Sequence, residues 1–75
     1  MKIVIANSIA QETTSRSIMN KVRMGVYLIH SKNIGNRTEF HFTDKSCIEV
    51  VEYDTHYVIT DFKGQDIKAQ NTIKK

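Results

Sequence analysis

The sequence predicts an α+β fold, in which one main helix packs on a small, mainly antiparallel sheet of four or five strands. Three observations support this prediction. One stretch, residues 14–24, carries apolar residues at helical spacing. Three stretches between residues 38 and 62 have the composition of strands, and short turn-forming segments separate them. The expected order of elements is β-α-β-β-β-β, or β-α-β-β-β without a strand at the end.

The beginning of the chain predicts a strand followed by a loop. Residues 2–6 form a short run rich in β-branched side chains, which is typical of a strand. The next residues are polar and small. Residues 8–11 fit a helix capping box, but no apolar periodicity follows them directly. We therefore expect a loop over residues 7–13.

The helix is predicted over about residues 14–24. Ile18 and Val22 lie four residues apart, as on one face of a helix. Threonine and serine at positions 13–15 are suitable N-caps, and two basic residues in the last turn suit the C-terminus of a helix. Gly25 is a natural residue just after a helix end.

The segment after the helix has two interpretations. Residues 26–30 either continue the helix or form a strand. We favour the strand, because Gly25 interrupts helices and because valine, tyrosine and isoleucine prefer strands. Residues 31–36 have the composition of a loop.

The second half of the chain predicts most of the sheet. Strands are expected at residues 38–43, 47–53 and 56–62, and Gly64 ends the last of them. Residues 65–75 have weak periodicity and a basic end, and the sequence leaves open a short helix, a strand or a frayed tail. A chain of 75 residues is expected to form a single domain.

The turns between these strands set the pairing of their residues. A three-residue loop at 44–46 places Phe42 opposite Ile48 and His41 opposite Glu49. A two-residue loop then joins the second and third of these strands. The sheet face expected to meet the helix consists of Phe40, Phe42, Ile48, Val50, Tyr57 and Ile59.

The opposite face of the predicted sheet is half apolar, which is unusual for a face that meets only water. This composition indicates a surface that binds another molecule. We therefore expect a small, non-enzymatic binding or regulatory module that docks on a larger macromolecule, with a protein as the partner. The expected protein-binding residues are Val51, Tyr53, His56, Val58 and Phe62.

Charge is segregated along the chain. Residues 1–37 have a net charge of +5, residues 38–62 of −5 and residues 63–75 of +3. Such segregation concerns partners and self-association rather than fold. It supports an alternative function, a regulator that binds nucleic acid through the basic helix and tail. The residues expected to contact nucleic acid are Arg16, Asn20, Lys21, Arg23, Lys74 and Lys75.

No catalytic motif is present, so we expect no enzyme, no cofactor and no metal. A third function is a small ribonuclease that uses His41, Glu49 and His56 for acid–base work. A stabilising cross-strand pair explains the same residues more simply. Metal binding near Cys47 is not expected, because the predicted pairing sets Cys47 opposite Thr43 and away from His41.

The cysteine count and the apolar runs predict a compartment. Cys47 is the single cysteine, which excludes an internal disulfide of the kind that stabilises small secreted domains. The chain does not begin with the pattern of a secretory signal. Its longest apolar runs are far shorter than the ~20 residues that span a bilayer. We expect a cytoplasmic protein that makes no membrane contact.

Overall fold

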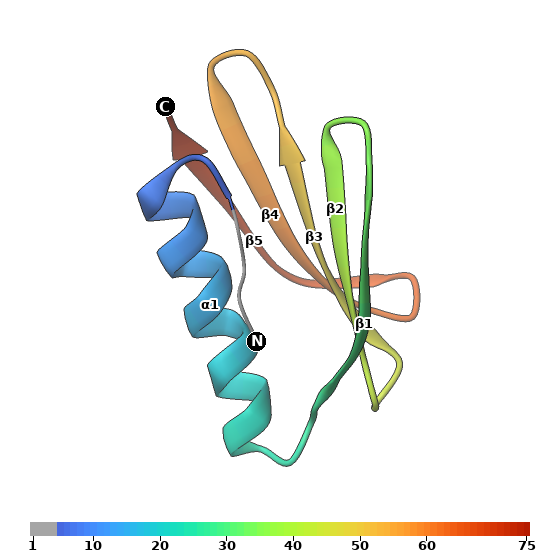
Figure 1. The fold of residues 1–75 in the computed structure, drawn as a ribbon. Helices are drawn as coiled ribbons and strands as arrows, with labels where there is room; N and C mark the ends of the chain where they lie inside the picture. The colour runs from blue at the N-terminus through green and yellow to red at the C-terminus, as the bar shows by residue number, and fades with distance from the viewer. Residues whose placement is uncertain (1–4) are drawn as a thin grey trace.

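The structure, a computed structural model, describes residues 5–75. These residues form one helix and five strands, and the strands make a single open antiparallel sheet in chain order. The elements are α1 (Ser8–Arg23), β1 (Leu28–Ile34), β2 (Arg37–Phe42), β3 (Ser46–Glu52), β4 (His56–Lys63) and β5 (Asp66–Lys74). Figure 1 shows α1 across one face of the sheet, nearest to β4 and β5. The predicted α+β class is confirmed.

The predicted first strand, residues 2–6, lies largely outside the described residues. Its last two residues, Ile5 and Ala6, belong to no strand. Ile5 nevertheless packs against the core. Within residues 5–75 the order of elements is therefore α-β-β-β-β-β.

The prediction of a loop over residues 7–13 was wrong, because α1 already begins at Ser8. The side chain of Asn7 caps the helix by accepting hydrogen bonds from the backbone N–H groups of Ile9 and Ala10, each at 3.0 Å. The start of the helix is therefore set by a cap immediately before the predicted capping box.

The first turns of α1 escaped the sequence analysis because they bury small side chains. Ala10, Thr14 and Ile18 lie one turn apart and are all buried. The hydroxyl of Thr14 donates to the carbonyl oxygen of Ala10 at 2.8 Å, which satisfies its hydrogen bond inside the helix. Only one residue of this stripe is large and apolar, so the helical periodicity is invisible before Ile18.

The helix ends as predicted. Gly25 has a φ of 81°, and its N–H donates to the carbonyl oxygen of Val22 at 3.0 Å. The N–H of Val26 donates to the carbonyl oxygen of Lys21 at 2.9 Å, which completes a Schellman motif. Because the chain then enters β1, the strand interpretation of residues 26–30 is the correct one.

The two edge strands are longer than the sequence indicated. The prediction of a loop over residues 31–36 was wrong for residues 31–34, which belong to β1. Only Gly35 and Asn36 form a turn. Residues 65–75, left open before, contain β5. Most side chains of both strands are exposed, so neither sequence shows the alternation that marks a half-buried strand.

The loop between β2 and β3 begins one residue earlier than predicted. It consists of residues 43–45 rather than 44–46. Lys45 closes it in a left-handed conformation, with a φ of 69°, and donates its N–H to the carbonyl oxygen of Phe42 at 3.1 Å. This is the geometry of a three-residue hairpin loop whose last residue has a positive φ.

This shift of the loop changes the cross-strand partners but not the faces. The predicted pairs of Phe42 with Ile48 and of His41 with Glu49 were wrong, and His41 lies opposite Cys47. Because both ends of the loop lie one residue earlier than predicted, each residue of β2 pairs two positions earlier on β3. Since side chains alternate with a period of two, every side chain keeps its predicted face.

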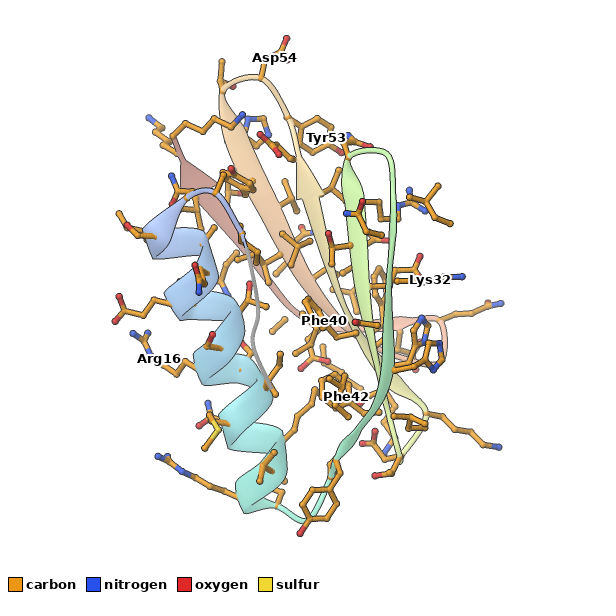
Figure 2. All side chains as sticks on the ribbon, in the orientation of Figure 1. Arg16, Lys32, Phe40, Phe42, Tyr53 and Asp54 are labelled. Atoms are coloured by element: carbon orange, nitrogen blue, oxygen red, sulfur yellow. The ribbon has the colours of Figure 1, made fainter. Side chains whose placement is uncertain are left out.

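The predicted core face is confirmed. Figure 2 shows Phe40 and Phe42 in the space between the sheet and α1. Val50 pairs with Ile59 across β3 and β4, which is the pairing expected for the two-residue turn of Asp54 and Thr55. All six residues predicted for this face are at most 4% exposed: Phe40, Phe42, Ile48, Val50, Tyr57 and Ile59.

A polar link joins the end of α1 to the sheet beside this core. The Nζ of Lys21 lies 3.1 Å from Oδ1 of Asp61 and donates to Oγ of Ser46 at 3.0 Å. It also lies 5.1 Å from the centroid of the Phe42 ring. The Lys21 side chain is only 15% exposed. The ammonium group of Lys21 therefore makes its contacts within the protein rather than with solvent.

We expect Lys21→Ala to lower the free energy of unfolding by about 1–3 kcal/mol, because it leaves a largely buried carboxylate and hydroxyl without their donor. The matched control is Arg16→Ala on the same helix. Arg16 pairs with Glu12 at 3.2 Å, but both side chains are exposed, so its loss should cost less than about 0.5 kcal/mol. Urea denaturation measures both. Equal losses for the two variants would show that the Lys21 link does not stabilise the fold.

Candidate functional site

A groove runs between α1 and the edge strand β1. It has a volume of about 510 Å³, within the usual range for binding sites of about 300–1,000 Å³. Among the strands, the helix packs most closely on β4 rather than on β1. The residues that line this α1–β1 groove are Ser15, Ile18, Met19, Val22, Leu28, Ile29, His30 and Ser31.

Large apolar side chains are exposed around this groove. Met19 is 52% exposed and Ile29 is 63% exposed. Met24, at 82%, and Tyr27, at 56%, lie in the connection between α1 and β1. Methionine is flexible and adapts to varied partners, so two exposed methionines favour binding over a purely structural role. Exposed apolar side chains gathered in one region indicate a surface that contacts another molecule.

The strand that forms one wall of the groove is also an open edge of the sheet. Within the described residues, β1 pairs only with β2, so its other side offers N–H and C=O groups to an incoming strand. The pairing of β1 with β2 shifts between Leu28 and His30. Lys32 is the one lysine of β1, and beyond it the edge carries little of the charge that blocks strand addition.

The protein-binding residues predicted from the sequence lie on the face opposite the helix, at three places along it. Val51 and Val58 pair across β3 and β4 and are half-buried. Tyr53 and His56 stack at the hairpin tip, with ring centroids 4.9 Å apart, and Figure 2 shows Tyr53 there. Phe62 lies near the other end of β4 and is half-buried. Of the five residues, only Tyr53 is a large hydrophobic side chain that is exposed, at 48%.

The residues predicted for nucleic-acid binding do not form a free basic stripe. Arg16 pairs with Glu12, and Lys21 points into the protein. Lys75 lies 2.8 Å from Glu52, and this hydrogen bond raises the pKa of Lys75. These ion pairs offset the charges of three of the six residues predicted to contact nucleic acid. The remaining members, which make no ion pair within the described part of the chain, are Asn20, Arg23 and Lys74.

The structure does not assemble the predicted acid–base group. His41 Nε2 lies 2.9 Å from Glu39 Oε1, whereas Glu49 pairs with Arg37 at 3.3 Å. His41 is opposite Cys47, which in turn is opposite Phe62. Phe62 therefore marks the position of His41 on β4. His56 lies six residues from Phe62 along that strand, which is about 20 Å at the usual rise per residue. Two imidazoles so far apart do not act on one bond.

Comparisons of the chain with protein-family models, with curated proteins and with solved structures find no match. Within residues 5–75, no helix has both the length and the apolar character needed to cross a membrane. The α1–β1 groove was not predicted from the sequence, although one signal was present. Apolar residues 24–29 follow a helix that they do not extend, and such side chains need either a core or a partner.

Proposed function

We propose that this protein is a non-enzymatic docking module that binds an extended segment of a partner protein along β1. The observation that supports this proposal is the combination of an open sheet edge with an adjacent apolar groove. A segment that adds to β1 as a sixth strand gains main-chain hydrogen bonds along the edge. Its alternate side chains then enter the groove, as in other cases of strand addition.

Charge indicates the kind of segment. Lys32 lies on the face of β1 that points away from the groove, beside Glu39 at 3.7 Å, and its side chain is 52% exposed. A bound strand with apolar residues toward the groove and acidic residues on the other face places its carboxylates on the same side of the sheet as Lys32.

The same charges disfavour a second copy of this chain as the occupant. Antiparallel pairing of β1 with β1 brings Lys32 of the two copies to neighbouring strands. Like charges at such positions destabilise a sheet. The half of the chain that contains this edge carries a net charge of +5. An acidic partner gains from this charge, whereas a second copy is repelled by it.

A labelled peptide of alternating valine and glutamate tests the proposal by fluorescence anisotropy. We expect it to bind, and we expect the same peptide with lysine in place of glutamate to bind at least tenfold more weakly. Ile29→Asp should weaken binding of the acidic peptide at least tenfold, because it places a charge in the groove wall. Ile67→Asp is the matched control, since Ile67 is 57% exposed on β5, the opposite edge strand.

Three results would count against this assignment. Loss of binding in Tyr53→Ala but not in Ile29→Asp would move the docking surface to the other face. Equal loss of binding in Ile29→Asp and Ile67→Asp would show that the peptide does not recognise the β1 edge. Tight binding to duplex DNA, with the logarithm of affinity falling by about 0.9 per phosphate contact against the logarithm of salt, would favour the nucleic-acid function instead.

A further inference from the structure

Three different metal-ligating side chains meet on the face of the sheet opposite the helix. Glu39 and His41 lie two residues apart on β2, and Cys47 lies directly opposite His41 on β3. One ligand atom from each residue lies within 4.8 Å of the other two. All three side chains are half-buried. This Glu39–His41–Cys47 cluster depends on the observed register, which brings Cys47 to His41.

The spacing of the cluster approaches that of a tetrahedral metal site. Zinc bonds of about 2.0–2.3 Å place tetrahedral ligand atoms about 3.3–3.8 Å apart. The Oε1 of Glu39 and the Nε2 of His41 are 2.9 Å apart. Small rotations of these side chains therefore reach the required geometry, while the two paired strands hold the backbone in place.

We propose that Glu39, His41 and Cys47 bind a divalent transition-metal ion of the zinc class. The donors are one carboxylate oxygen, one imidazole nitrogen and one thiolate sulfur, a set that suits zinc and cobalt rather than magnesium or calcium. Three protein ligands leave the fourth tetrahedral position to water.

The charges around the cluster favour a cation. A hydrogen bond with His41 lowers the pKa of Glu39. Burial, together with the carboxylates of Glu39 and Glu49, raises the pKa of the Cys47 thiol. A metal ion bound at the sulfur offsets the negative charge of these two carboxylates. It binds Cys47 as the thiolate, so metal binding releases the thiol proton.

One neighbouring residue restrains a ligand of the cluster, and another competes with a metal ion for a second ligand. His30 of β1 stacks on His41, with ring centroids 4.6 Å apart and an interplanar angle of 12°, and so restrains the orientation of that imidazole. Lys32 lies 3.7 Å from Glu39, and Arg37 lies 3.3 Å from Glu49. Metal binding at Glu39 displaces Lys32, so Lys32→Gln should tighten metal binding.

Cobalt titration of the full-length reduced protein, freed of metal by a chelator, tests this site. We expect one equivalent of Co²⁺ to produce a near-ultraviolet thiolate-to-cobalt absorption band, and Zn²⁺ to remove it by competition. Cys47→Ser should abolish the band. Glu39→Gln and His41→Ala should weaken binding at least tenfold, with circular dichroism confirming that each variant remains folded.

His56→Ala is the matched control, because His56 lies on the same face but far along β4. It should leave metal affinity within twofold of the unmodified protein. Absence of the band at millimolar Co²⁺ would overturn the proposal. So would equal losses in His41→Ala and His56→Ala, which would indicate adventitious binding to surface histidines. Neither result bears on peptide binding at β1, which is measured without metal.

Discussion

Phe42→Ala is expected to lower the free energy of unfolding by about 3–5 kcal/mol. Phe42 is 1% exposed, and its ring lies under the ammonium group of Lys21. Truncation removes the buried ring and leaves a cavity between the sheet and α1. A domain of 75 residues has a total stability of about 4–11 kcal/mol at ordinary values per residue. The variant should therefore lose a large fraction of the total stability.

Urea denaturation followed by circular dichroism measures this loss, and Phe62→Ala is the matched control. Phe62 is a phenylalanine of the same sheet, but it lies half-buried on the face that α1 does not cover. Its truncation should cost clearly less than that of Phe42, about 1–2 kcal/mol, in proportion to the smaller area buried. If the two variants lose equal stability, the outer face is a second core and not a surface.

The parts of the fold that were predicted are those in which a single local signal decides the structure. Gly25 ends α1 because a left-handed residue is needed there. The two-residue loop before His56 sets the pairing of β3 with β4. The alternation of large apolar residues along β2, β3 and β4 identifies the core face, because side-chain direction depends only on a period of two.

The parts that were missed depend on tertiary context. The first turns of α1 bury Ala10 and Thr14, whose small side chains become core residues only because the sheet lies against them. β1 and β5 are edge strands, and their exposed side chains are not restricted to an alternating pattern. Lys45 adopts a positive φ that glycine or asparagine usually provides, so the position of its loop was not evident.

The candidate sites show the same division. The sequence indicated a binding module, and it placed the anchors on the outer face of the sheet. The α1–β1 groove arises from the separation between the helix and β1, a distance that no local pattern encodes. Metal binding by His41, Asp44 and Cys47 was not expected, because the predicted loop set Cys47 opposite Thr43, two positions away from His41, and Glu39 was not considered as a ligand. An error of one residue in the loop thus removed a candidate site without disturbing the core.

A cross-link decides between the two registers, since only one of them places Cys47 opposite residue 41. We expect His41→Cys to form a disulfide with Cys47 almost completely under mild oxidation. Residues directly opposite on antiparallel strands have Cα atoms about 4.5–5.5 Å apart, which lies inside the disulfide range of about 4.4–6.8 Å. The oxidised variant should also gain about 2 kcal/mol of stability in the chain-entropy description, because the closed loop is short.

Thr43→Cys is the control, because the predicted register places Thr43 opposite Cys47 and the structure does not. In the observed register Thr43 lies in the loop and Cys47 is paired with His41, so Thr43→Cys should oxidise much less than His41→Cys. Mass spectrometry with thiol labelling, in the presence of a chelator, measures the oxidised fraction of each variant. Efficient oxidation of Thr43→Cys with little oxidation of His41→Cys would refute the register. That result would also refute the proposed metal site, because His41 and Cys47 would no longer lie opposite each other on β2 and β3.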